Sequence, residues 1–176
     1  MDKIKQELFE ELSNCKGVVS DLWIEKAALS PLPDSFFMQT YFPIDIKFSN
    51  SIYAKAFARV LMARGDKLSE GKLCLVYYLK NPTMDGTNLV IPYLRERATA
   101  FLTQFEKAML QAVAEDDAGW FQLVVCTLSA GLSLSAKAKK RLEKSYSRLS
   151  SLTPDKRELD LSQTMQSLIN NRLPIT

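Results

Sequence analysis

The strongest constraint on the fold comes from residues 71–94, which read GKLCLVYYLKNPTMDGTNLVIPYL. This segment holds two apolar runs separated by residues that favour turns. The first run, 73–79, is apolar on both faces, as in a strand that is covered on both sides. Short apolar runs bounded by turn residues are typical of paired strands. The sequence therefore predicts a β-hairpin with strands at 72–80 and 88–93.

Two connections could join these strands, and they turn opposite faces of the second strand inward. A two-residue Asp85-Gly86 turn is a strong local hairpin signal, but it carries Pro82 into a paired strand. A longer loop, Asn81–Thr87, pairs apolar residues with apolar residues and keeps Pro82 out of the ladder. We therefore expect the longer loop.

Most of the remaining chain predicts helices. An apolar row at helical spacing predicts a first helix from Asp2 to Leu29, in which Gly17 marks an alternative break. This row consists of Ile4, Leu8, Leu12, Cys15, Val19 and Leu22. Further helices are expected over 51–64, 94–115 and 161–172, and a basic helix capped by Ser133 or Ser135 is expected to run through Leu152. Residues 44–48 alternate between apolar and polar, which favours a third strand.

The segment 120–129 is apolar nearly all round, so periodicity alone does not distinguish a helix from a strand. Its place between two expected helices and the polar residues Asp116 and Asp117 before it favour a buried helix. The chain is therefore expected to be α+β, with a small antiparallel sheet covered by a mainly helical layer. We expect a single domain over 1–176, with 156–176 a candidate for a loosely attached C-terminal helix.

The side chain that enzymes use most often for acid–base chemistry is lacking. The chain has no histidine, which excludes Ser–His and Cys–His nucleophile pairs and imidazole metal ligands. Its three cysteines lie far apart and have no CxxC spacing, so we expect free thiols. The segment 65–72 has five residues between its glycines, where a P-loop needs four. We expect no enzyme activity, no catalytic residue, no cofactor and no metal.

Charge is distributed unevenly along the chain, although the net charge is only +3. Residues 1–46 carry four basic and eight acidic side chains. Residues 47–72 carry six basic and two acidic ones, and residues 137–157 carry eight basic and two acidic ones. An acidic start and two basic segments could face different partners.

The expected basic helix that ends at Leu152 combines a basic face with an apolar row, which would let it pack inward and present charge outward. Such a face can follow the phosphates of nucleic acid. The candidate nucleic-acid-binding residues are Lys137, Lys140, Arg141, Lys144 and Arg148, together with Lys55 and Arg59 of the first basic segment. The competing interpretation is an ordinary solvated helix face, and the isoelectric point of 8.7 lies below the value of about 9 typical of nucleic-acid-binding domains.

Two functions follow as hypotheses. The first is a non-enzymatic protein that binds DNA or RNA, as a DNA-associated accessory or regulatory protein. The alternative is a protein–protein adaptor or chaperone-like module, expected to be dimeric, that uses apolar surface from 36–42 or from the C-terminal helix. The N-terminal residues lack the apolar core of a signal peptide, and no apolar run is long enough to span a membrane. We therefore expect a cytoplasmic protein without a membrane partner.

Overall fold

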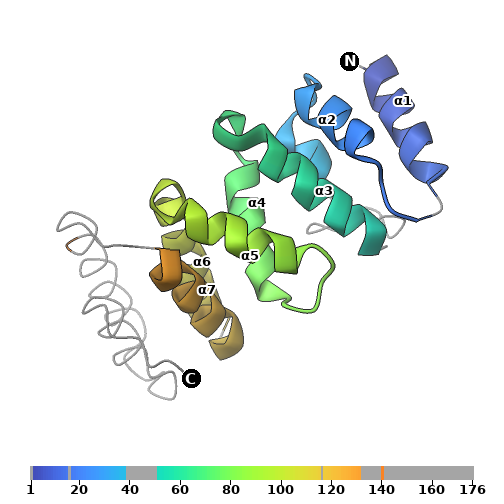
Figure 1. The fold of residues 1–176 in the computed structure, drawn as a ribbon. Coiled ribbons are helices and arrows are strands. Elements are labelled where there is room, and N and C mark those ends of the chain that lie inside the picture. Colours follow the sequence, from blue (N-terminus) through green and yellow to red (C-terminus); the bar gives the residue numbers. More distant parts are fainter. Residues whose placement is uncertain (1, 16, 39–50, 116, 132–139, 141–176) are drawn as a thin grey trace. The chain divides into compact units, whose positions relative to one another are not determined.

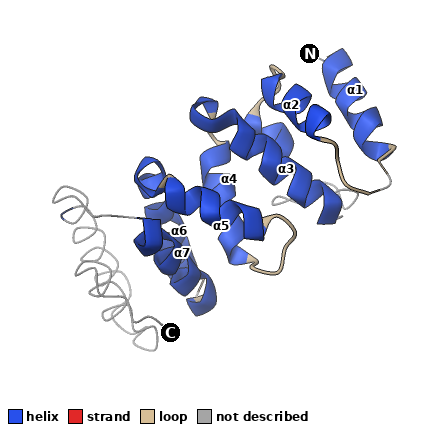
Figure 2. Ribbon diagram, viewed as in Figure 1, coloured by secondary structure: helices blue, strands red, loops and turns tan. Residues whose placement is uncertain are grey.

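The structure is a computed structural model that describes residues 2–15, 17–38, 51–115, 117–131 and 140 (Figure 1). Within these residues the regular structure is helical and contains no strand (Figure 2). The prediction of an α+β fold is therefore wrong, because the described chain is all-α. The contacts divide the chain into two compact units, Met1–Val90 and Ile91–Thr176. The expectation of a single domain stays a prediction, and residues 156–176 lie outside the described residues.

The first unit is built from short helices. In chain order these are α1 (Asp2–Ser13), α2 (Asp21–Leu29), the 3₁₀ helix η1 (Asp34–Met38), α3 (Ser51–Arg64), η3 (Gly65–Lys67), α4 (Gly71–Tyr77) and η4 (Tyr78–Lys80). Helix α5 (Thr87–Glu96) begins in this unit and continues past its boundary. Helix α3 is central to the unit, since α2, η1 and α4 all pack on it.

The expected first helix is divided at the alternative break around Gly17. Helix α1 ends at Ser13, and α2 starts at Asp21 after the N-cap Ser20. The Ser20 hydroxyl accepts a hydrogen bond from the Trp23 backbone N–H at 3.2 Å, which satisfies one of the free donors at the start of a helix. The Trp23 indole N–H donates to the Leu8 carbonyl at 3.1 Å and joins the two helices.

The predicted hairpin is wrong, because its first strand, 72–80, forms α4 and η4. A run that is apolar on both faces suits a buried helix as well as a strand. Tertiary contacts decide between them here, because the buried Asp34 carboxylate accepts hydrogen bonds from the Ser69 and Gly71 backbone N–H groups. This carboxylate, distant in sequence, caps the start of α4.

The second predicted strand, 88–93, lies in α5. Gly86 has a φ of +100°, and its carbonyl accepts hydrogen bonds from the Leu89 and Val90 N–H groups that open the helix. Pro92 lies inside α5 and is exposed, so its missing N–H does not leave a gap in the core. The third predicted strand, 44–48, lies outside the described residues.

The second unit contains the end of α5, the 3₁₀ helix η5 (Ala98–Phe101), α6 (Leu102–Ala114) and α7 (Ala118–Gly131). The expected helix 94–115 is thus interrupted at η5. Helices α6 and α7 pack against each other, and Phe105, Met109, Val124 and Leu128 are buried. The predicted helix at 120–129 is confirmed, and the Asp117 carboxylate caps it by accepting from the Trp120 N–H at 2.9 Å.

Candidate functional site

Apolar side chains of α2 and of the segment just before it lie in solvent among the described residues of the first unit. Val18, Leu22 and Leu29 are 84%, 75% and 78% exposed. The opposite side of the same helix is buried through Trp23, Ile24 and Ala27. We name the three exposed residues the α2 face. Large exposed apolar groups are costly in water, and several gathered together mark an interaction surface.

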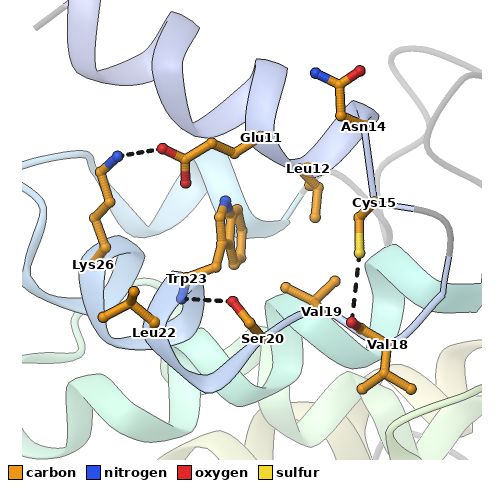
Figure 3. Close-up of a pocket in the computed structure, with 10 residues that line it drawn as sticks. All are labelled: Glu11, Leu12, Asn14, Cys15, Val18, Val19, Ser20, Leu22, Trp23 and Lys26. Carbon is orange, nitrogen blue, oxygen red and sulfur yellow. Dashed lines mark hydrogen bonds and ion pairs between the residues drawn. The ribbon is translucent and has the colours of Figure 1, made fainter.

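A hollow of about 340 Å³ lies between the end of α1 and the start of α2 (Figure 3). Its wall mixes apolar side chains with a few polar ones: Glu11, Leu12, Asn14, Cys15, Val18, Val19, Ser20, Leu22, Trp23 and Lys26. In Figure 3 the Glu11 carboxylate from α1 meets the Lys26 ammonium from α2 at one side, with 2.5 Å between Oε1 and Nζ. The hydrogen bond that Lys26 donates to the Glu11 carboxylate raises the pKa of Lys26, and Glu7 adds a smaller electrostatic effect.

A second hollow, of about 300 Å³, lies between the 17–19 segment, α3 and the turn before α5. It is lined by Gly17, Val18, Val19, Lys55, Ala56, Arg59 and Asp85. Val18 and Val19 line both hollows. The exposed Val18 thus contributes to the wall of both hollows, and the two hollows together with the α2 face form the candidate site.

The predicted basic residues of the first unit have different roles. Arg59 forms an ion pair with Asp21 and donates a hydrogen bond from Nη1 to the Val19 carbonyl at 3.4 Å. These contacts fix its guanidinium beside the second hollow. Lys55 lies one turn earlier on α3 and is exposed. The structure thus brings Lys55 and Arg59 together at one site.

The predicted basic helix is mostly undescribed. Lys140 is helical and exposed and belongs to the second unit. Lys137, Arg141, Lys144 and Arg148 lie outside the described residues. Nucleic-acid binding therefore stays a prediction. Phe36 and Phe37, from the aromatic segment expected to supply an apolar surface, are core residues at 9% and 0% exposure, and 39–42 lies outside the described residues.

The most buried charged cluster of the described chain surrounds Asp34. Its Oδ1 accepts from Arg64 Nη1 at 2.7 Å, and the two side chains are 4% and 8% exposed. The Arg64 guanidinium also lies 4.7 Å from the centre of the Phe37 ring. Burial alone would raise the pKa of Asp34, but hydrogen bonds from Ser69, Arg64 and Gly71 outweigh it and hold the pKa below its ordinary value. This cluster joins η1, α3 and α4, and we assign it a structural role.

No arrangement for chemistry is found among the described residues. Burial, with a smaller effect from Asp34, raises the pKa of the Cys74 thiol to about 12, which makes it a poor nucleophile. No three His, Cys, Asp or Glu side chains gather as a metal site in the described chain.

None of the helices in the described chain is long and apolar enough to cross a membrane. No family model, curated protein or solved structure matches the chain.

The sequence pattern groups Leu22 with residues that are buried, whereas the structure leaves Leu22 exposed. A continuous helix over 2–29 puts Leu22 in one apolar row with Leu8 and Leu12. The break around Gly17 changes the phase, so that the buried row of α2 is Trp23, Ile24 and Ala27. The sequence signal that indicates a new helix start here is Ser20-Asp21, a good N-cap residue followed by an acidic first helical residue.

Proposed function

We propose that this protein is a non-enzymatic binding module that docks a helix of a partner protein on the α2 face. The observation that carries the proposal is the exposure of Val18, Leu22 and Leu29, of which Val18 and Leu22 line a preformed hollow. The core of the unit is otherwise well buried around α3, so these side chains are not needed to close it. Burying a leucine side chain that is otherwise exposed is worth about 1.5–3 kcal/mol.

A helix is the occupant that suits this surface. Leu22 and Leu29 are seven residues apart, two turns of α2 or about 10 Å along its axis. Amphipathic helices dock through apolar anchors at such spacings. The hollow of about 340 Å³ beside Leu22 has room for an apolar anchor of the partner, and binding energy concentrates at anchors that fill pockets.

Charge indicates the character of the partner helix. Helices α1 and α2 together carry six acidic and three basic side chains. Glu7 and Glu11 both act on the single Lys26 beside the hollow. A partner helix with basic residues flanking its apolar stripe is therefore electrostatically complementary to this unit.

The test begins with a photo-crosslinking amino acid at Leu22, and separately at Asn88, in cells that express the full chain. Asn88 is exposed and lies in the first turn of α5. A discrete adduct with one protein is expected at Leu22 and not at Asn88. Binding of that purified protein is then measured for Leu22→Asp and for the charge-matched control Asn88→Asp.

We expect Leu22→Asp to weaken binding at least tenfold, because an aspartate would have to be desolvated in an apolar contact. Asn88→Asp should bind like the wild type. Equal adducts at both positions, no discrete adduct at Leu22, or equal affinities of the two variants would refute the proposal.

A further inference from the structure

The second hollow, between 17–19, α3 and the turn before α5, has a chemistry that the docking of a helix does not use. Its floor is small and apolar, since Gly17, Val19 and Ala56 line it and the last two are buried. Its volume of about 300 Å³ lies at the lower limit for ligand pockets. It therefore fits one residue of a peptide.

Two cations line this hollow from successive turns of α3. Arg59 is held in place by Asp21 and the Val19 carbonyl, and it retains further N–H donors beyond those two contacts. Lys55 is exposed and forms no ion pair with another described residue. An ammonium beside a fixed guanidinium favours a carboxylate.

The second hollow is also lined by a carboxylate, from Asp85 in the turn before α5. Asp85 is exposed and also has no ion-pair partner in the described chain. The turn that carries it approaches α3 closely, since a Cβ at Gly86 would lie 3.2 Å from the Lys55 Cα. The hollow thus offers an apolar floor, two cations for a carboxylate and one carboxylate for an N–H donor.

We infer that this hollow binds the C-terminal residue of the partner chain, and that this residue is aliphatic. Its side chain would lie on Val19 and Ala56, its terminal carboxylate would pair with Lys55 and Arg59, and its backbone N–H would donate to Asp85. An internal acidic residue supplies the carboxylate but no apolar group for the floor. The inference rests on the proposed function and identifies which part of the partner reaches Val18.

The inference also gives the partner helix a direction. Val18 lies just before the N-terminal end of α2 and lines the second hollow. A partner whose last residue occupies that hollow has its C-terminus near the start of α2. Its helix would then run antiparallel to α2.

The probes are N-acetyl-leucine and N-acetyl-leucinamide, which differ only in the carboxylate, titrated into the ¹⁵N-labelled full chain. We expect N-acetyl-leucine to bind weakly and to shift the amide signals of Gly17, Val19 and Ala56. The amide should bind at least tenfold more weakly. Lys55→Met should reduce binding of the acid at least fivefold, whereas the exposed Lys67→Met should leave it unchanged.

Three results would overturn the inference: equal binding of acid and amide, equal effects of the two lysine variants, or shifts scattered away from the hollow. The variant Leu29→Asp separates this test from that of the proposed function. Leu29 does not line the second hollow, so this variant should bind N-acetyl-leucine normally even though it damages the α2 face.

Discussion

Removing the charge of Asp34 tests how the first unit is held together. In Asp34→Asn the side chain keeps its shape, but the ion pair with Arg64 is lost and the hydrogen bonds to the Ser69 and Gly71 N–H groups are weakened. Arg64, whose side chain is 8% exposed in the wild type, would lose the carboxylate with which it pairs. Breaking a buried pair in this way costs about 3–5 kcal/mol, a large part of the 5–15 kcal/mol that stabilises a typical domain.

The contribution of the Asp34 carboxylate to the free energy of unfolding decreases as the pH falls. The pKa of Asp34 is lowered in the folded protein, so the unfolded chain binds its proton more tightly. The carboxylate therefore contributes its full stability above the unfolded pKa of about 4, and this contribution is lost as the pH falls through the lower folded pKa. The difference between wild type and Asp34→Asn should accordingly be constant near neutral pH and shrink under acid conditions.

The assay is urea unfolding followed by Trp23 fluorescence in a Trp120→Phe background, which leaves one tryptophan in the first unit. The control is Glu11→Gln, which breaks the Lys26–Glu11 pair, whose side chains are 42% and 48% exposed. Exposed pairs of this kind contribute little to stability, because water screens them. A loss below 1 kcal/mol for Asp34→Asn, or a loss no greater than that of the control, would refute the structural role of the cluster.

Three further outcomes are expected. Gly86→Ala should lower the free energy of unfolding by about 1–3 kcal/mol, because φ at Gly86 is +100° and the new Cβ would crowd Lys55 and Ala58. An unchanged urea unfolding curve would contradict this expected loss of stability. Cys74 should be the slowest thiol to react with Ellman's reagent at pH 8, because its pKa is about 12 and it is buried, and labelling as fast as Cys15 would argue against the fold of α4. If the basic segment 137–157 binds DNA, its affinity for DNA should fall steeply with salt and vanish when its four aligned basic residues are neutralised. Tight DNA binding by that variant in gel-shift titrations would refute the nucleic-acid hypothesis. The residues to neutralise are Lys137, Arg141, Lys144 and Arg148.

Helices with independent local signals could be predicted from the sequence, and segments decided by distant contacts could not. Helix α3 runs from Ser51 to Arg64, as its spacing and the following Gly65 predict. Helix α7 begins after the expected cap, Asp117. By contrast, 72–80 is apolar on both faces, and the group that starts α4 is Asp34, more than thirty residues away.

The candidate site was only partly accessible to sequence reasoning. The sequence marks Lys55 and Arg59 as basic residues of one segment, and the structure places both at the second hollow. Their neighbours could not be inferred, because the hollow exists only where the 17–19 segment and the turn at Asp85 come to α3. The apolar spacing assigns Leu22 to the row of one continuous helix, since spacing does not show where a helix breaks and changes phase.

Hydrogen–deuterium exchange tests most directly whether α2 is the docking surface. The full chain is compared with and without the protein that crosslinks at Leu22. We predict slower exchange over 17–29 and at the start of α3 in the complex, and unchanged exchange in α6 and α7. Protection of other segments while 17–29 exchanges as in the free chain would show that α2 is not the docking surface.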